Sequence, residues 1–198
     1  MSDITTVDLI RHGEPVGGRR YRGQQDDPLS GKGWQQMMSA VDGYRSWQQI
    51  VTSPLLRCHD FAITLGEQLA IPVQDEVRFK EIGFGAWEGR TPDELRQSEP
   101  ELLMRFYHDP ITHRPEDAEE SVAFIDRVVE AWQDLLREHT GRHVLVVAHA
   151  GVIRAIIGYV LEMPAANMFR LQIDNAAISR IQIDVERPPT LVFHNGRI

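Results

Sequence analysis

Cysteine is nearly absent from this 198-residue chain, and long apolar runs are missing. The single Cys58 cannot form a disulfide within the chain, which predicts a reducing, cytoplasmic compartment. No stretch reaches the ~20 apolar residues of a membrane-spanning helix. The segment Met1–Thr6 lacks the basic and apolar regions of a signal peptide, so we expect neither a leader nor a membrane anchor.

Basic residues are also in deficit. The 21 lysines and arginines face 29 acidic residues, for a net charge of −8. This balance argues against general binding to nucleic acids or membrane surfaces. The histidines show no tight ligand spacing, and His139 and His143 straddle Gly141. We therefore predict no metal site and no cofactor.

Strand and helix patterns alternate along the chain, with no repeat, low-complexity tract or Gly/Ser linker between them. We expect strands at residues 5–10, 50–52, 143–148, 177–185 and 190–194, and helices at 30–47, 54–70, 117–139 and 151–161. Ser53 is the predicted N-cap of the second helix, with Pro54 as its first residue. A capping box at Thr91–Glu94 predicts one more short helix. The alternation predicts an α/β fold, a three-layer α/β/α sandwich around a mostly parallel sheet.

Two histidines follow apolar runs that we expect to be buried strands. Arg11-His12-Gly13-Glu14 follows residues 7–10, and His149 follows residues 144–148. Ligands of open α/β sheets bind beyond the carboxyl ends of strands, so both histidines are candidates for one site. A fixed cation such as Arg11 orients a phosphoryl group and favours the neutral, nucleophilic form of the ring. For His149 alone, a capping or core role explains the sequence equally well.

A third candidate is Arg57, within Ser53-Pro54-Leu55-Leu56-Arg57-Cys58. It falls in the first turn of a predicted helix, where free N–H groups and the helix dipole favour anions. A guanidinium there can bind phosphate oxygens in a bidentate way. The alternative is a surface arginine paired with a carboxylate.

A fourth segment, Lys80-Glu81-Ile82-Gly83-Phe84-Gly85-Ala86-Trp87-Glu88-Gly89, interleaves glycines with aromatic residues. This pattern predicts a tightly turned loop. A glutamate in such a loop suits proton donation to a leaving alkoxide. Glu81 and Glu88 both qualify, and a solvated glutamate before a turn is the alternative for either.

In this order, the four segments resemble the histidine phosphatase superfamily, also called the phosphoglycerate mutase-like family, over essentially the whole chain. The shared motifs are Arg-His-Gly-Glu, Ser-Pro-Leu-x-Arg-Cys, Glu-x-x-Phe-Gly-x-Trp-Glu-Gly and a late His-Ala-Gly. The resemblance implies that His12 becomes phosphohistidine and that Glu81, rather than Glu88, is the acid and base. It also implies a phosphate pocket completed by Arg11, Arg57, a protonated His149 and the backbone at Ala150.

The chain departs from the family pattern in its phosphate loop. Pro15-Val16-Gly17-Gly18 replaces a segment that carries an asparagine in many relatives. Gly23 and Gln24 fill the place of the family's second phosphate-loop segment. We expect Gln24 to contact the phosphate in place of the missing asparagine. These departures affect substrate identity and leave the phosphohistidine chemistry intact.

The resemblance implies one histidine phosphatase domain over residues 1–198, with a small cap-like segment at about 90–115. The stretch between Glu81 and His149 is shorter than in glycolytic mutases and looks like that of phosphatases, including the α-ribazole phosphatases. We therefore expect a metal-independent, histidine acid phosphatase-type phosphomonoesterase for a small-molecule phosphate ester, with α-ribazole 5′-phosphate as the preferred guess. The alternative is a phosphoglycerate mutase-type phosphotransferase. A catalytically silent phospholigand-binding module is disfavoured because all five catalytic positions are intact.

Two further groups of residues bear on the substrate. Phe84, Trp87 and Tyr107 could form an apolar wall of the site or belong to the core. The cluster Arg19, Arg20 and Arg22 could meet anionic substrate groups or form a solvated face. A homodimer is compatible with the sequence, which does not fix the oligomeric state.

Overall fold

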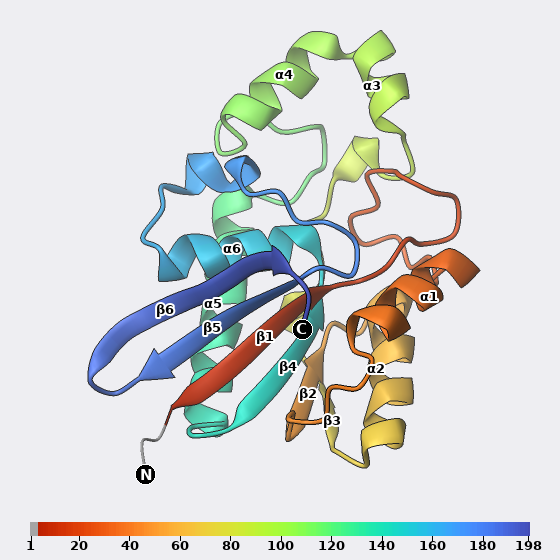
Figure 1. Ribbon diagram of the computed structural model, residues 1–198. Helices are drawn as coiled ribbons and strands as arrows, with labels where there is room; N and C mark the ends of the chain where they lie inside the picture. The colour runs from red at the N-terminus through yellow and green to blue at the C-terminus, as the bar shows by residue number, and fades with distance from the viewer. Residues whose placement is uncertain (1–3) are drawn as a thin grey trace.

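A six-stranded sheet forms the centre of the protein, with the strand order β3-β2-β4-β1-β5-β6 (Figure 1). The computed structural model describes residues 4–198, so the start of the Met1–Thr6 segment lies outside the described residues. Strands β1 to β4 are mutually parallel, whereas β5 and β6 are antiparallel to their neighbours. The strands are β1 (Thr5–Arg11), β2 (Gln49–Thr52), β3 (Val73–Asp75), β4 (His143–Ala148), β5 (Ile178–Asp184) and β6 (Arg187–Gly196).

Helices cover both faces of this sheet because its central strands are apolar on both sides. In β4, Val144 and Val146 pack on one face, with α5 (Ser121–Glu138) and α6 (Ala150–Val160). Leu145 and Val147 pack on the other face, with α1 (Gly31–Ala40) and α2 (Leu56–Leu69). The predicted three-layer α/β/α sandwich with a mostly parallel sheet is confirmed.

Two shorter helices, α3 (Pro92–Ser98) and α4 (Pro100–His108), lie beyond one end of the sheet (Figure 1). Thr91 and Glu94 form the predicted capping box at the start of α3. A separate apolar cluster packs beneath these helices and includes Trp87, Leu95 and Phe106. In the described part of the chain, no helix is long and apolar enough to cross a membrane.

Three predicted helix boundaries were wrong. The first helix ends at Ala40 instead of residue 47, because a turn with Gly43 at φ 74° follows it. The long helix starts at Ser121 instead of residue 117, where Asp117 has a left-handed φ of 56°. Helix α2 starts at Leu56.

Ser53 is therefore not the N-cap of α2. The N-cap is Leu55, which makes no side-chain capping hydrogen bond. Instead, the amide of Leu56 donates to the carboxylate of Asp26 at 2.7 Å. The Ser53 hydroxyl is buried and lies 2.8 Å from Nε2 of His149. The Ser53 hydroxyl, which the local sequence pattern predicted to cap a helix, therefore contacts His149, a residue far away in the sequence.

Candidate active site

The register of the sheet brings the two strand-end histidines together. Arg11 at the end of β1 pairs with Ala148 at the end of β4, so His12 and His149 leave the sheet side by side. The amide of His12 donates to the carbonyl of Ala148 at 3.0 Å. The two imidazole centroids lie 5.2 Å apart in an edge-to-face arrangement.

His12 has the protonation state of a nucleophile. Its Nδ1 lies 2.7 Å from the carbonyl oxygen of Gly13, and because a carbonyl can only accept, Nδ1 must carry the hydrogen. Nε2 then holds the lone pair. Burial lowers the pKa of His12 well below its usual value, and the charges of Arg11 and Arg57 lower that pKa further. The ring is therefore neutral at physiological pH.

Arg11 and Arg57 line the same cavity as His12 and are held by backbone carbonyls. Arg11 donates from Nη1 to the carbonyl of Ile173 at 2.6 Å, and burial lowers its pKa to about 10. Arg57 donates to the carbonyls of Gln25 and Gly23 at 2.6 and 2.7 Å. The Nε atom of each arginine is buried and has no hydrogen-bond partner among residues 4–198. An oxyanion would relieve this deficit in hydrogen bonding.

His149 lies behind His12, completely buried and outside the residues that line the cavity. Its Nε2 lies 2.8 Å from the Ser53 hydroxyl. Burial lowers the pKa of His149 well below its usual value, and Arg57 and His12 lower it further. Burial therefore disfavours a charged His149 in the free protein, and the protonated His149 that the resemblance implies stays a prediction for the phosphate-bound site.

Glu81 lines the same cavity as His12. Its carboxylate accepts the amide of Gly151 at 3.1 Å and the amide of Ile82 at 3.0 Å. A Cβ at Gly151 would lie 2.2 Å from Oε1 of Glu81, so only glycine permits this approach. The start of α6 thus fixes the position of the carboxylate that the resemblance selects as acid and base.

Arg127, on α5, holds the backbone that carries Glu81. Its Nη1 donates to the carbonyl oxygens of Arg78 and Lys80, the latter at 2.9 Å, and its Nη2 donates to that of Glu81 at 3.3 Å. Nε and Nη2 also bind the carboxylate of Glu119 at 2.7 and 2.9 Å.

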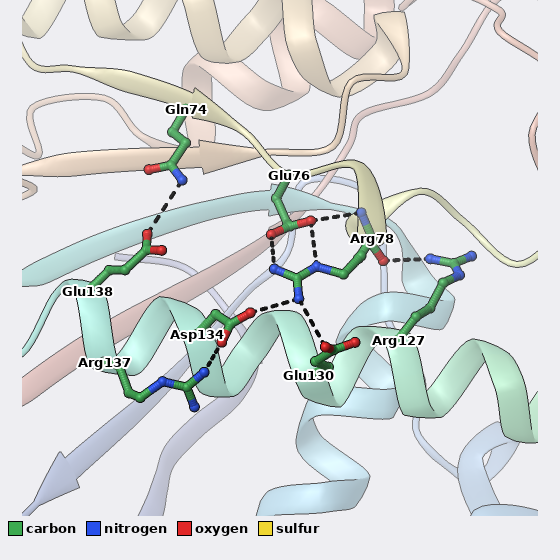
Figure 2. Close-up of polar contacts among 8 residues, drawn as sticks. All are labelled: Gln74, Glu76, Arg78, Arg127, Glu130, Asp134, Arg137 and Glu138. Carbon is green, nitrogen blue, oxygen red and sulfur yellow. Dashed lines mark hydrogen bonds and ion pairs between the residues drawn. The ribbon is translucent and has the colours of Figure 1, made fainter.

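The upstream end of this segment is fixed to α5 as well. Figure 2 shows the Arg78 guanidinium between Glu76 and two acidic residues of α5, Asp134 and Glu130. Its contacts to Glu76 and Asp134 measure 2.6 and 2.7 Å. Two arginines therefore connect residues 76–81 to one helix.

The second glutamate of this loop has a different role. Oε1 of Glu88 accepts the backbone amides of Gln24 and Phe84, each at 3.0 Å, and Glu88 does not line the cavity. A Cβ at Gly23 would lie 2.0 Å from that oxygen. The geometry thus favours Glu81 over Glu88 as a proton donor.

Among the predicted phosphate contacts, Gly23 and Ala150 line the cavity and Gln24 does not. The side-chain amide of Gln24 instead lies 3.4 Å from the carbonyl of Glu81. Gln24 thus contacts the backbone of the acid rather than the space where phosphate would bind.

The cavity above His12 has a volume of about 850 Å³. Of the aromatic residues for which the sequence left a cavity wall or a core position open, Phe84 and Tyr107 line the cavity, together with Tyr21 and Phe169. Trp87 does not: it is fully buried and its indole N–H donates to Glu99 at 3.1 Å. The core interpretation is therefore right for Trp87, because its ring packs against Phe106 beneath α4.

Arg154 is a charged cavity residue that sequence reasoning missed. It lies on α6, five positions after His149, and is the only charged residue of that helix. A lone arginine within Gly151-Val152-Ile153-Arg154-Ala155-Ile156-Ile157 was the available signal. Within the described residues, no group of three or more His, Cys, Asp or Glu side chains is placed to hold a metal ion.

Residues 7–196 match the family model of the histidine phosphatase superfamily (branch 1). A bifunctional protein of Mycobacterium tuberculosis is 33% identical over 181 residues, which cover 88% of this chain and 49% of that protein. The chain thus spans about half the length of the first curated relatives it matches. A probable phosphoglycerate mutase GpmB of Citrobacter koseri is 30% identical, over 88% of this chain and 83% of its own.

Solved structures show the same likeness over nearly the full chain. A mycobacterial glucosyl-3-phosphoglycerate phosphatase superimposes with a TM-score of 0.86 at 28% identity, covering 98% of this chain and 99% of the other. The α-ribazole phosphatase from Shigella flexneri gives 0.82 at 28% identity, covering 97% and 96%.

Proposed function

Since this chain belongs to the histidine phosphatase superfamily, we propose that it is a metal-independent phosphomonoesterase that acts on a small phosphorylated metabolite through a phosphohistidine. One observation carries the proposal. His12, whose Nδ1 is hydrogen-bonded to Gly13 and whose burial favours the neutral ring, lines one cavity together with Arg11, Arg57 and the carboxyl group of Glu81.

The reaction then has two steps. Nε2 of His12 attacks phosphorus, the P–O ester bond breaks, and Glu81 gives a proton to the departing oxygen. Arg11 and Arg57 offset the charge on the equatorial phosphoryl oxygens. In the second step Glu81 takes a proton from water, water attacks phosphorus, and the P–N bond breaks to release phosphate and neutral His12.

His149 starts this cycle neutral and buried behind His12. A dianionic phosphoryl group next to it favours the charged ring, because an opposite charge raises the pKa of a histidine. We propose that His149 takes up a proton when phosphate binds and then acts as a third cation of the pocket.

For the substrate, we propose α-ribazole 5′-phosphate as the first compound to test. The likeness to the Shigella α-ribazole phosphatase supports it. The aromatic side chains on the cavity wall, Tyr21, Phe84, Tyr107 and Phe169, offer flat apolar surfaces to a heterocyclic base.

A phosphoglycerate mutase-type phosphotransferase is the second candidate. The 30% identity to a probable phosphoglycerate mutase and the arginine-rich cavity favour it. A mutase must keep water away from the phosphoenzyme while the intermediate turns.

Rapid quenching with radiolabelled p-nitrophenyl phosphate tests the chemistry. We expect an acid-labile, alkali-stable phosphoenzyme that His12→Ala abolishes and that His108→Ala, an exposed histidine on α4, retains. A phosphoenzyme that persists in His12→Ala would refute the assigned nucleophile. Isomerisation of 3-phosphoglycerate with 2,3-bisphosphoglycerate, faster than phosphate release from any ester, would establish the mutase instead.

A further inference from the structure

The cavity carries far more positive charge than one phosphate requires. Seven arginines line it against three carboxylates, Glu14, Glu81 and Asp174, which leaves an excess of four positive charges. The whole chain has a net charge of −8, so this concentration is local. Arg11 and Arg57 belong to the phosphate pocket described above, and Arg22 is paired with Asp27 at 3.0 Å.

The four remaining residues, Arg19, Arg20, Arg154 and Arg170, are here called the distal arginines. Within residues 4–198, none of them forms an ion pair. The cavity carboxylates other than Glu81 are engaged elsewhere. Glu14 binds Lys32 at 3.0 Å, and Asp174 accepts hydrogen bonds from Gln172 and Asn195.

Arg154 is the only one of the distal arginines that is not exposed. Its Nε donates to the carbonyl of Leu171 at 2.9 Å, and its guanidinium carbon lies 5.1 Å from the ring centroid of Phe169. Its two terminal nitrogens make no hydrogen bond to any described residue. Burial lowers the pKa of Arg154, while Glu81 raises it. The result is a half-buried guanidinium with a fixed plane and its terminal N–H groups free.

We infer that Arg154, with Arg19 and Arg170 at the rim, forms a subsite for a second anionic group on the alcohol half of the substrate. A guanidinium removed from water needs an oxyanion to offset its lost hydration, and its two terminal N–H groups match a carboxylate or phosphate. A volume of about 850 Å³ is sufficient for a whole metabolite rather than for a phosphate group alone.

This inference rests on the proposed phosphatase chemistry and concerns the half of the ester that leaves. An arginine can bind a carboxylate or a phosphate group. Two matched pairs of phosphate esters therefore distinguish which of the two groups the subsite binds. Glycerol 3-phosphate and 3-phosphoglycerate differ by a carboxylate, and fructose 6-phosphate and fructose 1,6-bisphosphate differ by a phosphate. α-Ribazole 5′-phosphate, the first compound proposed above, is the fifth substrate. It has no second anion, so the subsite predicts that it is a poorer substrate than an anion-bearing ester, and the two proposals compete.

The experiment measures kcat/KM for all five esters in the wild-type protein. We expect the member with the extra anion to be preferred by about 10- to 100-fold in at least one pair, since a charge-assisted bidentate contact has this order of effect on binding. The preferred pair identifies the anion. Equal rates within both pairs, or a preference for α-ribazole 5′-phosphate over both anion-bearing esters, would overturn the subsite and leave the phosphatase function standing.

Arg154→Gln should remove most of that preference, and Arg154→Lys should keep part of it because the charge remains. Arg187→Gln, the same change at an exposed position outside the cavity, is the matched control. If the Arg154→Gln protein does not fold, the same preference is measured in Arg170→Gln, which changes an exposed residue of the short helix Ala165–Arg170 at the rim of the cavity. An unchanged preference in a folded Arg154→Gln protein contradicts the inference.

Calorimetric binding of the same pairs to His12→Ala makes the subsite testable without turnover. Tighter binding of the anion-bearing ester, weakened by Arg154→Gln in that background, supports the subsite even if no ester is hydrolysed. Inactivity toward every ester and p-nitrophenyl phosphate would count against the proposed function alone.

Discussion

Replacing Arg127 by methionine removes the guanidinium that ties the Glu81 segment to α5. Methionine keeps much of the aliphatic stem, so the change isolates the charged group. Three backbone carbonyls, those of Arg78, Lys80 and Glu81, lose a donor, and the Glu119 carboxylate loses its partner.

The expected cost follows from burial. The Arg127 and Glu119 side chains are each 22% exposed, which places the pair between a surface ion pair and a buried one. Surface pairs contribute about 0–1 kcal/mol, and breaking a buried pair costs about 3–5 kcal/mol. Water can reach some of the freed carbonyls, so we expect Arg127→Met to lower the free energy of unfolding by about 2–3 kcal/mol. For a chain of this size that corresponds to a fall in Tm of roughly 4–12 °C.

A matched control lies on the same helix. The Arg137 side chain on α5 is 69% exposed. It pairs with Asp134, as Figure 2 shows. Arg137→Met should change the free energy of unfolding by less than about 0.5 kcal/mol. Urea denaturation of the three proteins measures both values.

Activity provides a second readout, because Arg127 holds the backbone of the proposed acid. Alkyl esters need a proton on the leaving oxygen, whereas p-nitrophenolate leaves without one. Arg127→Met should therefore slow hydrolysis of glycerol 3-phosphate about 10-fold more than that of p-nitrophenyl phosphate. Equal losses on both esters, or a stability change no larger than that of Arg137→Met, would refute the reasoning.

Four further predictions concern the chemistry and its pH dependence. Glu81→Gln should slow the hydrolysis of alkyl phosphate esters by about 10²–10⁴-fold and that of aryl esters much less. The same pattern in Glu88→Gln would show that the acid was wrongly assigned. Gly151→Ala should lower kcat on alkyl esters, since a Cβ 2.2 Å from the Glu81 carboxylate must displace it; wild-type kcat would contradict that geometry. Orthovanadate should inhibit and EDTA should not, and activity lost to EDTA and restored by a divalent ion would contradict the metal-independent mechanism. Burial lowers the pKa of His12 and His149 in the folded protein, so the unfolded chain binds more protons than the folded protein below pH ~6.5. The free energy of unfolding should therefore decrease as pH falls below this value. In urea titrations at pH 5–7, His149→Gln should make the free energy of unfolding less dependent on pH.

The sequence by itself determined the layers of the fold and the family. Apolar runs with the period of buried strands alternate with helical patterns, and this local signal predicted the sandwich that the structure shows. It also predicted the capping box at Thr91, because such a motif involves only neighbours along the chain. Motif order identified the superfamily, and the positions of His12, Arg11, Arg57 and Glu81 around one cavity agree with it.

Tertiary structure decided everything that depends on contacts distant in sequence. The register between β1 and β4 placed His149 behind His12, where burial keeps it neutral. Ser53 serves His149 instead of capping a helix, and Trp87 is in the core because Phe106 from α4 covers it.

The roles of Arg127 and Arg154 were equally beyond the reach of local pattern. Arg127 donates to carbonyls 46 to 49 positions earlier. Arg154 faces a cavity assembled from segments that lie far apart along the chain. Periodicity and capping report the conformation of neighbouring residues, whereas the charge, burial and partners of a side chain depend on which distant segments the fold places beside it.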